Sequence, residues 1–211
     1  MNFRTATFAV LVVATGVACA QWDPEPAVRQ RRSAVVYDGD DRTEVAAERE
    51  RFADVIATTV ALVPAERLGD GDPVAYEAPT LVEAYGLCED ERFADQPALA
   101  ECTGFFVDRE LVVTAAHCAR TTADCAGLAA VRSFALADGD AGPRPSIEPE
   151  RVHRCVDIAW RSLLQGSEQL SDWAFLRVEP PLPDDVPLPP LSERSLGRGD
   201  AVAVIGHPSG L

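Results

Sequence analysis

The sequence contains no lysine, because all 19 of its basic residues are arginine. P-loop nucleotide binding, Ser-Lys dyads and Schiff-base chemistry each need a lysine, so these three chemistries are excluded. Positive charge is scarce altogether: 34 acidic residues outweigh it and give a formal net charge of −15 and a pI near 4.5. A chain this acidic repels phosphate backbones, so we expect no nucleic-acid partner.

Long hydrophobic runs are also missing. The apolar stretch at 8–14 is far shorter than the ~20 residues that a membrane helix needs, so we expect no membrane span. This stretch follows Arg4 and precedes the small triplet Ala18-Cys19-Ala20, a pattern typical of a secretory signal peptide cut after Ala20. A rival interpretation is a lipoprotein signal that leaves a lipid anchor on Cys19. Both interpretations export the chain, and we expect it to be secreted or periplasmic.

Export changes the interpretation of the cysteines, because disulfides persist outside the cytosol. Five of the six cysteines remain once Cys19 leaves with the signal peptide: Cys88, Cys102, Cys118, Cys125 and Cys155. An odd number means that one thiol is free or that its partner is not in this chain. The sequence alone does not pair Cys88, Cys125 and Cys155.

The whole chain is 47% apolar and 25% charged, which is the composition of an ordinary globular protein. Helical patterns are confined to its first half. Residues 44–60 carry apolar side chains at roughly helical spacing, although 55–60 is β-branched enough to be a strand. Thr80-Leu81-Val82-Glu83 fits a capping box and predicts a short helix from Leu81 to about Leu87.

Strand patterns dominate after Cys102. The segments 104–107 and 111–115 flank a polar turn and indicate a hairpin. Further short strands are expected at 35–37, 131–136, 151–158, 173–178 and 201–205. The proline-rich stretch 180–190 excludes a helix or a central strand and indicates an extended linker. Many short strands separated by turns predict an all-β barrel or sandwich.

A histidine lies beside the second of the two cysteines that bracket the predicted hairpin. The string Thr114-Ala115-Ala116-His117-Cys118 resembles the histidine motif of trypsin-like (chymotrypsin-fold) serine endopeptidases. The resemblance implies that His117 is the general base. It also implies a disulfide between Cys102 and Cys118, which would close the hairpin and hold the backbone next to the imidazole.

A second motif supports the first. Residues 171–178 resemble the aspartate strand of the same family, which implies that Asp172 accepts a hydrogen bond from Nδ1–H of His117 and holds its tautomer. Histidine before aspartate is the chymotrypsin order. Asp157 is the rival carboxylate, and we favour Asp172. The other two histidines, His153 and His207, are expected to be structural or solvated.

The end of the chain departs from the family. Residues 199–210 resemble the first strand of the second barrel, closest to bacterial glutamyl-endopeptidase-like members. The family takes its nucleophile from a Gly-Asp/Asn-Ser-Gly turn, and no such turn follows the aspartate motif. Ser192 and Ser195 lie in a polar connector, and Ser209 follows a proline. We therefore assign no nucleophile in this chain and expect it to stop one strand into the second barrel.

These patterns predict an all-β fold: a trypsin-like double β-barrel of which only the first barrel and the start of the second are present. We expect a signal peptide at 1–20, an N-terminal segment or propeptide at 21–51, the first barrel at 52–190 and the start of the second at 191–211. The implied function is that of an exported serine endopeptidase, here a fragment, acting on protein or peptide substrates without a metal or organic cofactor. The alternative is a non-catalytic, protease-like binding protein.

Overall fold

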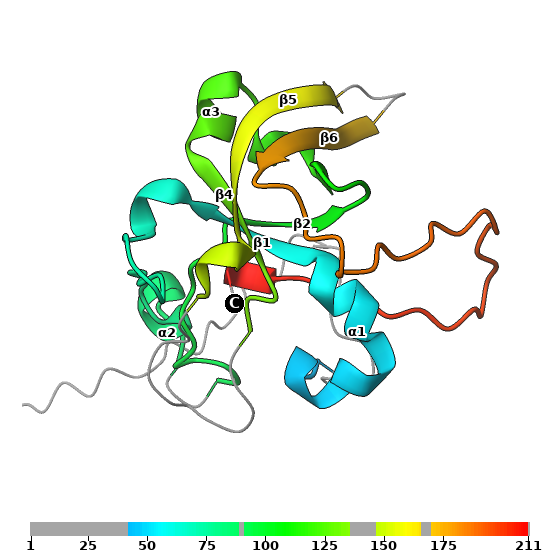
Figure 1. Cartoon of the computed structure of the whole chain (residues 1–211). Helices are drawn as coiled ribbons and strands as arrows, with labels where there is room; N and C mark the ends of the chain where they lie inside the picture. The colour runs from blue at the N-terminus through cyan, green and yellow to red at the C-terminus, as the bar shows by residue number, and fades with distance from the viewer. Residues whose placement is uncertain (1–41, 89–90, 136–146, 166–169, 211) are drawn as a thin grey trace, which may run out of the picture. The chain divides into compact units, whose positions relative to one another are not determined.

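The computed structural model describes residues 42–88, 91–135, 147–165 and 170–210 (Figure 1). All of them belong to the second of two units into which the chain divides, Asp41–Leu211. The expected signal peptide at 1–20, the lipid-anchor residue Cys19 and the strand at 35–37 lie outside the described residues. Within the described part, no helix has the length and apolar character needed to cross a membrane.

The stretch whose sequence allowed either helix or strand contains both. A 3-10 turn, η1 (Val45–Glu48), leads into helix α1 (Arg49–Thr58), and strand β1 (Thr59–Pro64) follows directly. At the junction, the hydroxyls of Thr58 and Thr59 both donate to the carbonyl of Val55, at 3.2 and 2.8 Å. Threonine hydroxyls compete in this way with the backbone ladder of a helix, so the helix ends where the fully buried strand begins.

Six antiparallel strands close into a barrel in the order β1-β2-β3-β6-β5-β4. The remaining strands are β2 (Cys102–Phe106), β3 (Leu111–Thr114), β4 (Leu128–Arg132), β5 (Val152–Gln165) and β6 (Leu170–Glu179). The mostly β architecture is therefore confirmed as one closed barrel, and the predicted hairpin is the β2–β3 pair. The strand predicted at 131–136 was displaced: β4 begins at Leu128 and ends before Ser133, whose φ of 49° is incompatible with a strand.

Alternating strand residues fill the barrel. Val60, Phe106, Val112 and Leu176 are each at most 1% exposed and belong to one apolar cluster. Gly104 is required where β1 and β3 approach β2, because a Cβ there would lie 2.7 Å from Val112 Cγ1 and 3.2 Å from Val60 Cγ2. The core thus begins within two residues of the cysteine that anchors the β2–β3 hairpin.

Two short helices lie outside the barrel strands. The capping box predicted for helix α2 (Leu81–Tyr85) is present, since Thr80 N donates to Glu83 Oε2 at 2.8 Å and Thr80 Oγ1 accepts from Glu83 N at 3.3 Å. The helix ends at Gly86, whose φ of 64° suits a glycine C-cap. Helix α3 (Thr122–Ala126) was not predicted, although Thr121 and Asp124 form a capping box there as well.

A disulfide that the sequence left undetermined joins helix α3 to the barrel. Cys125 of α3 is bonded to Cys155 of β5, with Cα atoms 5.3 Å apart. None of the described cysteines is free, so the free thiol allowed by the odd count is not found among them.

The proline-rich stretch 180–190 contains neither helix nor strand, as predicted, but it is attached to the barrel. Arg109 Nη1 donates to the carbonyls of Pro183 and Val186, each at 2.7 Å. Leu182 is only 2% exposed and packs in the barrel core. This part of the linker is therefore a fixed component of the fold.

The predicted strand at 201–205 is wrong: the segment is irregular, and Val204 is 95% exposed. No strand pairs with it among the described residues, and an unpaired strand has no ladder to stabilise it. The chain returns to the barrel just beyond, where His207 N donates to Thr103 Oγ1 at 2.8 Å. The 3-10 turns η2 (Ala65–Arg67), η3 (Ala116–Cys118), η4 (Pro149–Arg151) and η5 (Pro208–Gly210) complete the fold.

Candidate active site

His117 lies in the turn η3, immediately after strand β3. Its neighbour Ala116 is fully buried, and its other neighbour Cys118 is disulfide-bonded to Cys102 across a Cα–Cα distance of 6.3 Å. The imidazole is thus held between a buried side chain and a covalent link to β2. Such a frame restricts the orientation of the ring, as general-base chemistry requires.

Asp172 reaches this histidine from strand β6. The residues of β6 that face the barrel interior include Ala174 and Leu176, and Asp172 is on the same face, two residues earlier. Its Oδ2 lies 2.6 Å from Nδ1 of His117, and its Oδ1 accepts a hydrogen bond from the backbone N–H of His117 at 3.0 Å. Two contacts to one residue fix both the distance and the orientation of the carboxylate.

The electrostatics of the pair specify the histidine tautomer. The hydrogen bond from His117 is the main cause that holds the pKa of Asp172 below its ordinary value, so the carboxyl is ionised and can only accept. Nδ1 of His117 must therefore carry the proton, which leaves Nε2 as an acceptor in the neutral ring. Nε2 has no hydrogen-bond partner within the part of the chain that the structure describes.

Asp157, the rival carboxylate, lies elsewhere. It is on β5 opposite Arg177, and it forms no hydrogen bond to His117 within the described ranges. The other two histidines make structural contacts. His153 is completely buried and accepts from Arg132 Nε at 3.1 Å, and the His207 ring packs 6.0 Å from that of Phe134.

The candidate serines are not brought to the histidine. Ser192 hydrogen-bonds to the backbone of Arg194 within the connector. Ser209 lies in η5 with a φ of 57°, next to Gly210, whose carbonyl accepts from the backbone amides of Leu99 and Ala100, just before β2. None of the serines in the described residues forms a hydrogen bond with the His117 ring.

Three residues of metal-ligating type also meet at this point, since Cys102, His117 and Cys118 place donor atoms within 4.8 Å of one another. Their chemistry does not suit a metal ion, because both sulfurs are bonded to each other and Nδ1 is already bonded to Asp172. The cluster is explained by the disulfide beside the imidazole.

A closed antiparallel barrel that positions a His–Asp pair is the arrangement expected of a β-barrel peptidase domain. The family model of the trypsin-like peptidase domain matches residues 102–211, more than half of the chain. The chain belongs to this family of trypsin-like peptidase domains. No curated protein matches it.

Two features near the site were missed by sequence reasoning. One is the Cys125–Cys155 disulfide, and the other is a groove that contains Arg120 and Arg161. The arginines follow no motif, and the β-bulges that expose this part of β5 leave no recognisable signal in the sequence. Only the strand register reveals that these arginines and bulges belong to one groove.

Proposed function

We propose that this chain is an exported serine-type endopeptidase domain in which His117 is the general base and Asp172 its positioning carboxylate. Membership of the trypsin-like peptidase family supports protein or peptide substrates and a serine-dependent mechanism. The observation that carries the proposal is the two-point contact of Asp172 with Nδ1 and the backbone N–H of His117.

The chemistry follows from the tautomer. Nε2 of His117 accepts the proton of a serine hydroxyl as its oxygen attacks the peptide carbonyl, and Asp172 stabilises the resulting imidazolium. The imidazolium then gives the proton to the leaving amine, so the ring returns to its starting state. Neither step requires a metal or an organic cofactor, because the His117 imidazole performs both proton transfers.

The serine itself is not assigned to a residue. The sequence has no Gly-Asp/Asn-Ser-Gly turn after Asp172, and no described serine forms a hydrogen bond with the His117 ring. This observation favours the second candidate function, a non-catalytic peptide-binding relative. The ionised carboxylate aimed at Nδ1 favours the peptidase, since a binding protein has no chemical need for that geometry.

The tautomer of His117 tests the proposal without requiring turnover. We expect ¹⁵N NMR of the neutral imidazole to show a proton on Nδ1 and an unprotonated Nε2. Asp172→Asn should shift this equilibrium toward the other tautomer, because an amide oxygen is a weaker acceptor than a carboxylate. Asp157→Asn is the matched control and should leave the His117 signals unchanged. If Asp157→Asn changed them and Asp172→Asn did not, the assignment of the carboxylate would be wrong.

A further inference from the structure

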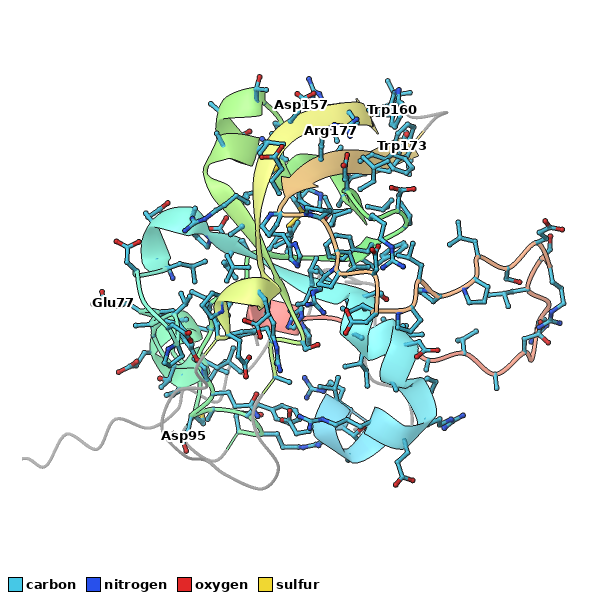
Figure 2. All side chains as sticks on the ribbon, in the orientation of Figure 1. Glu77, Asp95, Asp157, Trp160, Trp173 and Arg177 are labelled. Carbon is cyan, nitrogen blue, oxygen red and sulfur yellow. A yellow bond between two sulfur atoms is a disulfide. The ribbon has the colours of Figure 1, made fainter. Side chains whose placement is uncertain are left out.

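An open groove of about 550 Å³ lies between helix α3 and strand β5. One wall is the turn of Arg120, Thr121 and Thr122, which begins three residues after His117. The other wall is residues 157–161 of β5, and Figure 2 shows two of its residues, with Asp157 farther from the free end of the β5–β6 hairpin than Trp160. The groove therefore starts close to the candidate active site without containing its residues.

Both walls of the groove are held in place. The disulfide between Cys125 and Cys155 joins α3, which continues from the first wall, to β5 just before the second wall. The register of β5 against β6 shifts twice, between Cys155 and Asp157 and between Ile158 and Trp160. Bulges of this kind redirect side chains and bend a strand, and here they bring five consecutive residues of β5 to the groove.

The second wall is also a strand edge. Strand β5 pairs with β4 only through Val152, His153 and Arg154, and within the described part of the chain no other strand pairs with that edge beyond Arg154. An unpaired edge offers backbone N–H and C=O groups in the pattern that an added strand needs. An extended peptide can bind such an edge through its main chain, and side-chain contacts then decide which peptide binds.

The side chains of the groove are suited to acidic groups. Neither Arg120 nor Arg161 forms an ion pair with any described residue, although the chain as a whole has a net charge of −15. Asp157 supplies the one carboxylate of the groove, so its formal charge remains positive. Trp160, which is 58% exposed, adds an aromatic surface.

The groove is oriented toward the catalytic pair. Arg161 is opposite Ala174 in the β5–β6 ladder, and Leu163 is opposite Asp172. Opposite residues of an antiparallel pair share a face, so Arg161 and Asp172 lie on the same face, two strand positions apart or about 7 Å. Two residues of an extended peptide span a similar distance, at about 3.3 Å each, so an occupant of the groove can extend toward His117 within a few residues.

We propose that this groove is a binding site for an extended, acidic segment of the peptide substrate, whose carboxylates pair with Arg120 and Arg161. The description of the occupant as a substrate rests on the proposed peptidase function; the binding itself does not. The site lies in the first barrel and selects side chains near the cleaved bond by charge.

Binding of labelled ten-residue peptides to the purified mature chain, measured by fluorescence anisotropy, tests the proposal. We expect a peptide carrying three glutamates to bind roughly tenfold more tightly than its glutamine counterpart, since hydrogen bonds to charged groups are the stronger ones. Arg120→Gln and Arg161→Gln should each remove most of this preference. Arg198→Gln, which makes the same charge change at an exposed turn elsewhere, should retain it.

Two controls keep the result interpretable. Far-UV circular dichroism shows that each variant is folded, and Trp160→Phe identifies any fluorescence change that originates in the groove. Equal binding of the glutamate and glutamine peptides would overturn the proposal. Self-association of the Arg120→Gln/Arg161→Gln variant without any peptide preference in the wild type would show that the arginines only protect an exposed edge. Failure of the His117 tautomer test would leave a positive peptide result standing, so the two proposals fail separately.

Discussion

Acidification should destabilise the barrel through one buried histidine, His153. The imidazole is completely buried, its Nδ1 lies 2.5 Å from the carbonyl oxygen of Pro180, and its Nε2 accepts from Arg132 Nε at 3.1 Å. Both ring nitrogens are thus used by a neutral imidazole, and the ring of Phe106 packs edge-on at 5.1 Å. A second proton on Nε2 would point at the N–H of a guanidinium.

The sign of the effect follows from the pKa. Burial is the main cause that lowers the pKa of His153, and the nearby charge of Arg132 lowers it further, against the raising effect of the Pro180 carbonyl. The unfolded chain keeps a pKa near ~6.5 and so binds the proton more readily than the native state. The contribution of His153 to the free energy of unfolding is therefore fully present above pH ~6.5. It declines below that pH, by at most ~1.4 kcal/mol per pH unit.

Between pH 7.5 and 5.0 this amounts to a loss of up to about 2 kcal/mol, since only the interval below pH ~6.5 contributes. Asp172, whose pKa is lowered mainly by the hydrogen bond from His117, stays ionised over this interval. The remaining acidic residues act in the opposite direction, because approaching the pI of 4.5 relieves repulsion in a chain of net charge −15.

Urea unfolding of the wild type and of His153→Gln at pH 7.5 and 5.0 separates these effects. Glutamine retains one donor and one acceptor but does not titrate, so the variant should lack the loss on acidification. His207→Gln serves as the control at a partly exposed histidine. Parallel pH dependence of the unfolding midpoint in the wild type and in His153→Gln would refute the reasoning, because burial would then have no consequence for protonation.

Two further predictions concern the disulfide and the catalytic competence of the chain. Replacing Cys125 and Cys155 together by serine should lower the free energy of unfolding by about 3.6 kcal/mol in the chain-entropy model for a separation of 30 residues, measured by urea titration; an unchanged midpoint would contradict it. Purified residues 21–211 should not hydrolyse casein above background, because none of the serines that the structure describes is hydrogen-bonded to the His117 ring. Turnover that a serine-directed phosphonylating reagent blocks would show that Ser209 or another serine is a working nucleophile.

Local patterns in the sequence were sufficient for the motifs of this protein. The Thr80–Glu83 capping box, the β2–β3 hairpin and the irregular proline-rich linker depend on residues close in the chain, and each was predicted. The prediction of a strand at 201–205 was wrong because it depended on a residue pairing distant in the chain. A strand needs a partner, and its apolar alternation does not say whether one is present.

Only the tertiary structure decided the contacts between residues that are distant in the chain. The distance between His117 and Asp172, the pairing of Cys125 with Cys155 and the placement of Arg120 beside Arg161 all depend on barrel closure and on the register of β5 with β6. If the register of β5 shifted by one residue, its side chains would lie on the opposite face of the sheet, because each one-residue slip moves every side chain across the sheet. The sequence by itself determined which residues could perform chemistry, and the closed barrel decided which of them meet.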